Sequence, residues 1–388
     1  MQHCDPKELG FDRKRLERAA RVIDADVERE MCDGGAICVT RHGRVALFEH
    51  RGFADRAAGR QLSADDVFVS MSIGKQFTNA IVLGRVERGE LSLQMSVCEL
   101  IPEFSTRGKD RIQLHHLLSH TSGLMSGVPM LPPDQLANIE AFAMFAARST
   151  PEALAGDRVN YSILAAHSVM AEMVKRADGG TRSFTRILAE DLFEPLGMKD
   201  TWLGGRPDLV ARTCPVVARF SEPGLFEAQE IEGMALLLHM EGAELPAGGY
   251  LTTLNDVSRF AEMLRRGGEL DGARVLSPAM IEYASRNHTG LKPNEILNYT
   301  VSTRGWSTFP ASIGLGFFTR GEGVVPGPFG NLNSSRAFGG WGAGSTAFWI
   351  DPQYDMTFSF LSTGLMEDSR HIERVSRLSD IVIAALVE

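Results

Sequence analysis

The chain has 388 residues, of which 44% are hydrophobic and 23% are charged, and this composition is typical of soluble proteins with a large apolar core. The net charge of -9 disfavours nucleic-acid binding, because an acidic surface repels phosphate backbones. No stretch reaches the roughly 18 consecutive apolar residues of a membrane helix, and no apolar signal segment opens the sequence. These features predict a cytoplasmic protein without a nucleic-acid or membrane partner, and they leave its oligomeric state open.

The five cysteines are scattered along the chain and form no C-x-x-C pair. This pattern indicates neither a zinc site nor a disulfide framework, so we interpret the cysteines as reduced thiols, mostly packing residues. His116 and His120 are four residues apart, but without an H-E-x-x-H motif they do not predict a metal site. No Walker loop or G-x-G-x-x-G motif occurs either, and we expect an enzyme without a cofactor.

Helices and strands alternate in a simple order along the first part of the chain. Periodic apolar residues predict an amphipathic helix over residues 12–29. Two β-rich runs then flank His42-Gly43, a dipeptide that favours a tight hairpin turn. A helix is predicted from Ser72 to about Arg88, and helical patterns broken by Gly- and Pro-rich loops continue to about residue 266.

Strand patterns return near the C-terminus, where a turn at residues 351–355 joins two predicted strands and a closing helix follows over 371–388. Since hairpins occur at both ends, the economical fold is an α/β (α+β) one, with an antiparallel sheet built from both chain ends. We expect a single catalytic unit over residues 1–388, in which residues 1–65 and 240–388 form an α/β part and residues 66–239 a mainly helical insertion. For residues 291–338, rich in Gly, Pro, Asn and Phe, the elements are left unassigned.

Ser72 and Lys75 form an S-x-x-K pair at the start of the predicted helix, and Lys75 is the one lysine of this chain with a serine three residues before it. Residues i and i+3 lie on the same face of a helix, so the lysine amine can reach the serine oxygen. A serine hydroxyl needs such a base to become a nucleophile, and the free N–H groups of a helix N-terminus favour negative charge there. Ser70 has Ile73 at the same spacing, which excludes it as an equivalent nucleophile.

Further segments occur in a characteristic order: "LHHLLSHTSGL" at 114–124, "FEPLGMKDTWL" at 193–203 and "PAGGYLTTLNDVSRF" at 246–260. Together with the residues around Ser72 they resemble serine β-lactamases, penicillin-binding proteins and, most closely in motifs, class VIII carboxylesterases, over about residues 34–363. The resemblance implies the DD-peptidase/β-lactamase-like fold, with the active site in the cleft between the two parts. It also makes "LLSHTSGL", including Ser122, a structural turn of the family.

The second element of the family is a tyrosine that opens a Y-x-N motif, and the matching residue is Tyr161. The resemblance implies that Tyr161 passes protons between nucleophile and leaving group, a role that requires a cation such as Lys75 to lower its pKa. Ile163 stands where β-lactamases have asparagine, and it cannot donate a hydrogen bond to a substrate amide. This difference argues against β-lactam turnover and fits the esterases of the family.

The third element is a strand motif, K-T-G or an H-x-G or W-G-G variant, beside the nucleophile. The best match is Gly340-Trp341-Gly342, with Trp341-Gly342-Ala343 as the shifted alternative. It implies an oxyanion hole made of the backbone N–H groups of Ser72 and Ala343. Substrate would lie against Gly340 and Gly342, and Trp341 would replace the K-T-G lysine with an apolar wall. Aromatic candidates for an acyl pocket are Trp306, Phe309, Phe317, Phe318 and Phe329.

These features predict a serine hydrolase that cleaves a small-molecule carboxylic ester through an acyl-enzyme on Ser72, activated by Lys75 and Tyr161. No G-x-S-x-G elbow occurs, which disfavours the α/β-hydrolase alternative. A transacylase, an amidase or a D-aminopeptidase would use the same acyl-enzyme. A β-lactamase is less favoured, and a non-catalytic penicillin-binding-type sensor is the alternative of a different class. Acyl length, stereoselectivity and natural substrate stay open.

Overall fold

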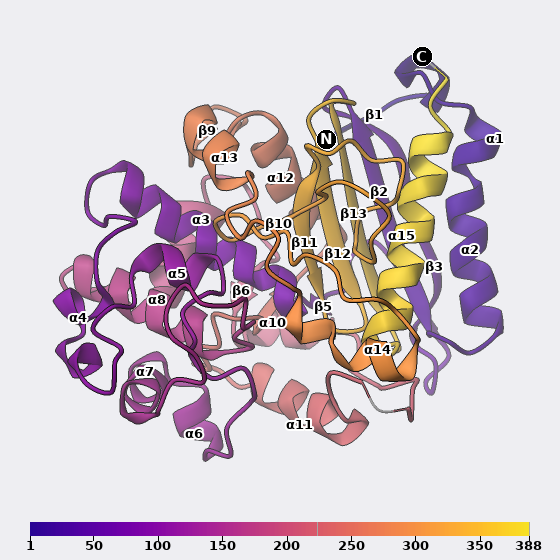
Figure 1. The fold of residues 1–388 in the computed structure, drawn as a ribbon. Coiled ribbons are helices and arrows are strands. Elements are labelled where there is room, and N and C mark those ends of the chain that lie inside the picture. Colours follow the sequence, from indigo (N-terminus) through magenta and orange to yellow (C-terminus); the bar gives the residue numbers. More distant parts are fainter. Residues whose placement is uncertain (223, 388) are drawn as a thin grey trace.

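The computed structural model of the chain describes residues 1–222 and 224–387 (Figure 1). Its main sheet has eight strands in the order β1-β3-β2-β13-β12-β11-β10, with β4 paired to β3. All of these pairs are antiparallel except β1 with β3, and β2 pairs with β13, which joins the two chain ends. The strands are β1 Gln2–His3, β2 Gly34–Arg41, β3 Arg44–Asp55, β4 Arg60–Gln61, β10 Phe318–Thr319, β11 Phe338–Gly342, β12 Thr346–Asp351 and β13 Met356–Thr363.

The hairpin between β2 and β3 turns at His42-Gly43, as the dipeptide predicts. His42 and Gly43 both have positive φ angles, 53° and 74°, and such a pair of left-handed residues matches the right-handed twist of the flanking strands. The second predicted hairpin is also present, since β12 and β13 pair antiparallel across residues 352–355. The fold class is confirmed: a mixed α and β protein with one sheet from both chain ends.

Helices cover both faces of the main sheet (Figure 1). On one face lie α1 (Arg13–Leu16), α2 (Arg18–Glu28) and the closing helix α15 (Asp368–Ala384), while α12 (Leu254–Arg265) packs on the other. The predicted helix over residues 12–29 is therefore two helices that break at Glu17. The closing helix begins three residues earlier than predicted, because the Glu367 side chain accepts hydrogen bonds from the first free N–H groups, those of Ser369 and Arg370.

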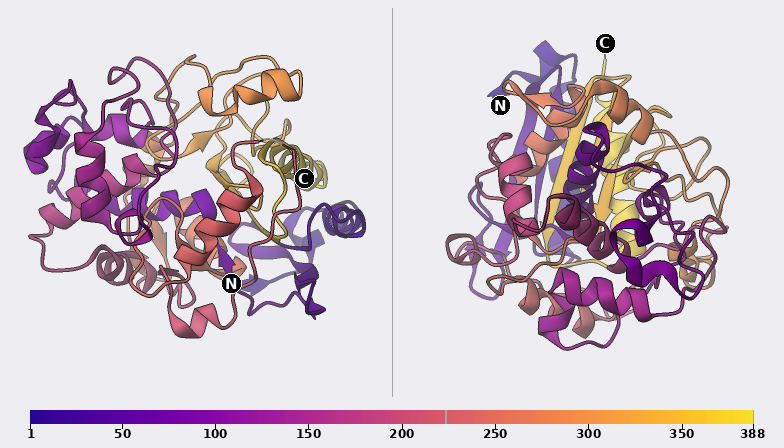
Figure 2. Two further views of the ribbon diagram at one scale, coloured as in Figure 1. Left: turned by 90° about the horizontal axis from the view of Figure 1, so that it is seen from below. Right: turned by 90° about the vertical axis from the view of Figure 1, so that its left-hand side faces the viewer.

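The helical part lies beside the β10–β11 edge of the sheet, and the two views of Figure 2 agree on this placement. A second, three-stranded sheet (β5 Phe68–Val69, β7 Tyr250–Thr252, β6 Trp202–Leu203) connects it to the chain beyond residue 240. No helix in the described ranges is both long enough and apolar enough to span a bilayer. The remaining α-helices are α3 Gly74–Glu87, α4 Val97–Leu100, α5 Leu114–Leu118, α6 Pro133–Leu136, α7 Ile139–Arg148, α8 Ala165–Ala177, α9 Phe184–Leu188, α10 Pro207–Val210, α11 Ala228–Leu238, α13 Pro278–Ala284 and α14 Tyr299–Thr303.

Helix α3 runs through the centre of the molecule, and its residues 74–85 are buried. Phe77 of this helix makes edge-to-face contacts with Phe193, Tyr250 and Phe260, with ring centroids 5.8, 5.3 and 4.9 Å apart. Such aromatic pairs contribute roughly 0.5–1.5 kcal/mol each beyond the apolar area they bury. They attach the helix to two distant parts of the chain, around residue 193 and over residues 250–260, and so fix the position of its N-terminus, which Ser72 directly precedes.

Residues 291–338 contain little regular structure: a short 3-10 helix at Glu295–Leu297, then α14 and the two-residue strand β10. Glycine and proline are poor formers of helix and strand interiors, which accounts for the long connections between them. This segment carries β10 to the edge of the main sheet, where Phe318 pairs with Gly339 of β11.

Candidate active site

Ser72 lies in a short 3-10 helix, Met71–Ile73, that leads directly into α3. Met71 has a φ of 49°, in the left-handed region that side chains other than glycine rarely adopt. Strain of this kind accumulates where a backbone must hold a functional group in one place. Ser70, by contrast, is fully buried and hydrogen-bonds to the carbonyl of Gly248 over 3.0 Å, so its hydroxyl has a structural role.

Lys75 is almost completely buried, with 2% of its surface exposed, and its Nζ lies 3.1 Å from Ser72 Oγ. The same nitrogen donates to the carbonyl oxygen of Ala247 over 2.8 Å. Among the described residues no carboxylate forms a salt bridge with it, and burial lowers its pKa to about 7. A substantial fraction of Lys75 is therefore neutral near pH 7 and can accept the proton of Ser72.

Three successive carbonyl groups at residues 246–248 accept hydrogen bonds from side chains around Ser72. Pro246 accepts from Thr78 Oγ1 over 2.7 Å, Ala247 from Lys75 and Gly248 from Ser70. Sequence reasoning recognised this segment only as a landmark of the family. Its bonding role carries no side-chain signal, because the groups involved are backbone carbonyls.

Tyr161 lies just before α8 and is buried beside Lys75, with the centre of its ring 5.2 Å from Lys75 Nζ. Burial raises the pKa of Tyr161 above its usual value, and a hydrogen bond with the Ser72 side chain offsets only part of this rise. A shuttle role for Tyr161 is conditional on Lys75 lowering this pKa, and the net shift is in the opposite direction. The physical reason is burial, which disfavours phenolate strongly, and it leaves Tyr161 as a neutral proton donor.

Strand β11 runs directly beside Ser72. A β-carbon at Gly342 would lie 2.7 Å from the backbone nitrogen of Ser72 and would also overlap Thr346 Oγ1, so only glycine fits there. Ala343 follows at the end of the strand and lines the same cavity as Ser72. The turn after it is attached to the start of α15, since Asp368 Oδ1 accepts from Gly344 N over 3.3 Å. Two backbone N–H donors, of Ser72 and Ala343, thus belong to segments that meet here.

The other residues of the strand motif have different surroundings. A side chain at Gly340 would overlap Gln76 Oε1, so this glycine permits close packing of β11 on α3. Trp341 points to the opposite face, is 5% exposed and packs on Phe318 with ring centroids 6.0 Å apart. None of the three predicted substrate contacts on this strand, Gly340, Trp341 and Gly342, is among the residues that line the cavity at Ser72. Strand alternation points Trp341 away from Ser72, whereas Gly340 and Gly342 share the face that packs closely on Gln76 and Ser72.

The cavity at Ser72 is small, about 50 Å³, and mostly apolar. Ile163 lines it, as the motif predicts, but the aromatic residues proposed for an acyl pocket do not. Its outer wall is instead formed by α11 and the preceding Phe226. Sequence reasoning missed this wall, because an apolar helix face indicates burial but not its neighbour. The cavity is lined by Met71, Ser72, Lys75, Ile163, Leu164, Phe226, Ile231, Met234, Leu238, Leu245, Ala247, Gly248, Gly249 and Ala343.

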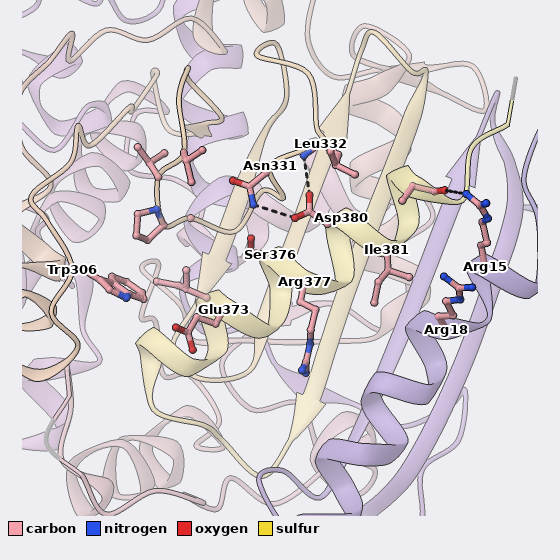
Figure 3. Close-up of a pocket in the computed structure, with 16 residues that line it drawn as sticks. Arg15, Arg18, Trp306, Asn331, Leu332, Glu373, Ser376, Arg377, Asp380 and Ile381 are labelled. Atoms are coloured by element: carbon pink, nitrogen blue, oxygen red, sulfur yellow. Dashed lines mark hydrogen bonds between the residues drawn. The ribbon is translucent and has the colours of Figure 1, made fainter.

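A larger groove of about 710 Å³ lies on the outer face of α15, between that helix, α1–α2 and the loop at residues 324–332 (Figure 3). In it Asp380 accepts hydrogen bonds from Asn331 Nδ2 and Leu332 N, over 3.1 and 2.8 Å. None of the predicted site residues lines this groove. Trp306, one of the aromatic candidates for an acyl pocket, lies here instead.

Comparison with known families identifies the chain. The family described as Beta-lactamase matches residues 19–380. The chain belongs to the beta-lactamase family. It is thus a serine hydrolase of the beta-lactamase fold, and a resemblance first noted from short motifs is confirmed over most of the chain.

Two curated relatives that are similar to this chain carry esterase names. "Esterase/beta-lactamase LipL" of Mycobacterium tuberculosis (strain ATCC 25618 / H37Rv) is 26% identical over 86% of this chain and 77% of that protein. "Esterase EstB" of Burkholderia gladioli is 31% identical over 50% of this chain and 54% of its own length.

Solved structures of the beta-lactamase fold superpose over nearly the whole chain. A penicillin-binding protein homologue from Caulobacter crescentus has a TM-score of 0.78 at 22% identity, covering 96% of this chain and 98% of the other. A family VIII carboxylesterase has a TM-score of 0.76 at 19% identity, covering 94% and 97%. EstCE1, described as a hydrolase with promiscuous acyltransferase activity, has a TM-score of 0.75 at 18% identity, covering 95% and 99%. At these identities the three structures establish the fold.

Proposed function

We propose that this protein hydrolyses small carboxylic esters through a covalent acyl-enzyme on Ser72. One observation carries the proposal: the Lys75 amine lies 3.1 Å from Ser72 Oγ and has a pKa of about 7. A base with a pKa near the working pH is the most effective, since it is neutral before the reaction and still holds the proton it receives. The hydroxyl of Ser72 therefore has a base within hydrogen-bonding distance.

In the proposed acylation step the Ser72 proton passes to neutral Lys75, and Oγ forms a bond to the ester carbonyl carbon. The carbonyl oxygen gains the negative charge and accepts hydrogen bonds from the N–H groups of Ser72 and Ala343. When the tetrahedral intermediate collapses, the bond to the alcohol oxygen breaks. Tyr161, which is neutral, gives its proton to that oxygen and recovers one from protonated Lys75.

In the deacylation step a water molecule replaces the alcohol. Its proton moves to the same Lys75–Tyr161 pair, and its oxygen attacks the acyl carbon. Collapse then returns a proton to Ser72 Oγ and releases the carboxylic acid. Every proton lost by a nucleophile is thus taken up by a leaving group, and the step needs no metal or organic cofactor.

Three features support an ester rather than a β-lactam as substrate. Ile163 lines the cavity where an asparagine would donate to a substrate amide, and the strand motif lacks the lysine that would attract a substrate carboxylate. The cavity itself is apolar. The curated relatives named as esterases agree with this choice. A small acyl or alcohol group without a charge is the substrate that this lining would bind.

A transacylase is the second candidate, because the wall of the cavity is apolar and an alcohol would compete there with water. EstCE1, a structural neighbour, is described as having acyltransferase activity. Adding benzyl alcohol to a hydrolysis assay separates the two reactions. Formation of a benzyl ester at the expense of free acid would identify a transacylase, while an unchanged yield of acid identifies a hydrolase.

The proposal is tested by intact-mass analysis after exposure to a fluorophosphonate, together with hydrolysis of p-nitrophenyl acetate and p-nitrophenyl butyrate. We expect one covalent adduct on the parent protein, hydrolysis of both esters and neither result for Ser72→Ala. Nitrocefin and a D-alanine p-nitroanilide, measured in parallel, test the β-lactamase and aminopeptidase alternatives. A folded parent protein that neither labels nor hydrolyses any of these substrates would leave the non-catalytic sensor as the correct description.

A further inference from the structure

His120 lies in the turn after α5, within the segment "LLSHTSGL" that the proposed mechanism does not use. It is 5% exposed, and its φ of 55° places it in the left-handed region. A non-glycine residue in this conformation is strained, and the surrounding structure must hold it there. Contacts with the surrounding residues must therefore stabilise this backbone conformation of His120, and these contacts indicate the role of the residue.

Three contacts of His120 enclose Tyr161. The carbonyl oxygen of His120 accepts a hydrogen bond from Asn160 N over 2.9 Å, and its Nδ1 accepts one from Ser162 N over 3.2 Å. Between these two bonds the imidazole stacks on the Tyr161 ring, with centroids 4.2 Å apart and planes inclined by 21°. The backbone on both sides of Tyr161 and its side chain are thus attached to one residue.

The other side of His120 leads back to the helix that carries the nucleophile. His167 of α8 lies next to it, with ring centroids 5.5 Å apart, and His167 Nε2 is 3.1 Å from Asn79 Oδ1. Asn79 belongs to α3 and follows Lys75 by four residues, so both lie on one face of that helix. The three side chains therefore connect Tyr161 with the face of α3 that presents the lysine amine.

The imidazole of His120 is neutral in this setting. Burial lowers its pKa to about 3, and the nearby charge of Lys75 adds to this effect. Because Nδ1 accepts the Ser162 N–H, the proton of the neutral ring belongs on Nε2. A neutral, flat ring of fixed orientation can support the phenol without placing a second cation beside Lys75.

We propose that His120 is a positioning residue for Tyr161, which holds the phenol at the distance from Ser72 and Lys75 that proton transfer requires. The inference rests on the proposed function, because it assigns His120 its role through the proton transfer of Tyr161. Displacing a proton-transfer group by about 1 Å can reduce a rate roughly 100-fold, so removal of the stacked ring has a measurable effect. The segment "LLSHTSGL" thereby gains a role in the reaction.

The test is a double-mutant cycle of His120→Asn and Tyr161→Phe, with His116→Asn as the matched control. Asparagine tolerates the left-handed backbone and keeps an oxygen acceptor, but it lacks the ring. His116 makes the same kind of bond, from Gln113 N to its Nδ1 over 3.0 Å, away from Tyr161. Turnover of p-nitrophenyl acetate is measured per Ser72 that reacts with fluorophosphonate, so that misfolded molecules are not counted.

We expect His120→Asn to lower kcat about 10–100-fold with KM within about threefold, and His116→Asn to leave both within about threefold. Added to Tyr161→Phe, His120→Asn should cause less than about a twofold further loss, since the group it positions is already gone. The inference is overturned if the fold-decrease in kcat of the double variant equals the product of the fold-decreases of His120→Asn and Tyr161→Phe. It is also overturned if kcat per reactive serine is unchanged in His120→Asn. His120→Gln, which keeps an acceptor on a longer arm, replaces His120→Asn if that variant does not fold.

The parent protein separates this inference from the proposed function. If the parent protein neither labels nor hydrolyses esters, the esterase proposal fails and the inference about His120 fails with it. If the parent protein is active and the losses multiply, only the role of His120 is wrong.

Discussion

Gly342 lies against Ser72 so closely that a β-carbon at position 342 would be 2.7 Å from the Ser72 nitrogen. This contact sets the distance between Ser72 and strand β11, which ends at Gly342, and with it the separation of the backbone N–H groups of Ser72 and Ala343. Glycine is required here by the close approach of two backbones, since its φ is not in the left-handed region.

The first prediction concerns this contact. Gly342→Ala should reduce kcat/KM for p-nitrophenyl acetate by about 10²–10³, the loss typical of one oxyanion-hole donor. Pushing β11 away from Ser72 should also lower the free energy of unfolding by about 1–3 kcal/mol. Gly127→Ala is the control, because Gly127 is exposed in a loop with no atom within 4 Å of the added carbon. A Gly342→Ala enzyme with parental kcat/KM would show that the strand position does not matter for the reaction.

The second prediction concerns the pH dependence of turnover. Lys75 must be neutral to accept the Ser72 proton, and its pKa is about 7, so kcat/KM should rise with pH and level off above that value. In Lys75→Arg, kcat/KM should no longer rise with pH and should be lower than in the parent by at least about 10³, because the guanidinium group stays protonated. The measurement is kcat/KM of p-nitrophenyl acetate between pH 5 and 9, with the proportion of folded protein checked at each pH.

Asp368 provides the control for this assignment. Burial also raises the pKa of Asp368 to about 7, and Glu367 adds to the shift. Titration of either Lys75 or Asp368 would therefore make kcat/KM change with pH near 7. Asp368→Asn keeps an oxygen acceptor for Gly344 N but cannot titrate. If the rise of kcat/KM with pH is due to Lys75, it remains in Asp368→Asn. If the rise disappears in Asp368→Asn, it is due to the carboxyl group of Asp368.

The third prediction concerns the effect of Lys75 on stability. The pKa of Lys75 is about 7 in the folded protein and 10.5 for an ordinary lysine in the unfolded chain, so the unfolded chain binds more protons between these two pH values. Protonated Lys75 thus opposes folding fully below pH 7, and this opposition disappears as pH rises toward 10.5. Lys75→Met should raise the free energy of unfolding at pH 7 by about 1–3 kcal/mol while abolishing turnover.

The difference between parent and Lys75→Met should become smaller from pH 7 to pH 10, because the folded lysine is then neutral and releasing the proton of the unfolded lysine costs less as pH approaches 10.5. Urea unfolding of both proteins at pH 6, 7, 8.5 and 10 measures this. Comparing the two proteins cancels the contributions of the other titrating groups. A difference that is independent of pH would mean that the Lys75 pKa is not lowered.

The fourth prediction concerns the cavity wall formed by α11. Met234 lines the cavity at Ser72, while Leu236 on the same helix is 73% exposed. Met234→Ala should enlarge the cavity and raise the ratio of kcat/KM for p-nitrophenyl hexanoate over acetate about 10-fold, the effect of one or two methylene groups in an apolar pocket. Leu236→Ala is the matched control and should leave the ratio within about twofold. If the hexanoate-to-acetate ratio of kcat/KM is equal in the parent, Met234→Ala and Leu236→Ala, the acyl group does not bind against α11.

The residues of one helix or one turn can be read from the sequence, since they depend on local geometry. The spacing of Ser72 and Lys75 follows from the i to i+3 relationship, and the left-handed pair His42-Gly43 follows from turn chemistry. Tyr161 was found through the order of family motifs. The position of Tyr161 beside Lys75 depends on the packing of α8 against α3, and the spacing of residues in the sequence does not predict this packing.

Packing between distant elements accounts for what sequence reasoning missed. Strand alternation separates Trp341 from Gly342, but which face meets the nucleophile was decided by the packing of β11 against α3. An apolar pattern on α11 predicts a buried face, yet only the folded chain brings that face to Ser72.

The sequence by itself determined the chemical groups of the site and the spacing of the serine and its base. Only the tertiary structure decided the pKa values of these groups, and thus their protonation states. Burial gives Lys75, which has no carboxylate partner among residues 1–222 and 224–387, a pKa of about 7, and burial also raises the pKa of Tyr161. The reason is that a pKa depends on how much water and charge surround a group, and here residues far apart in the chain exclude the water.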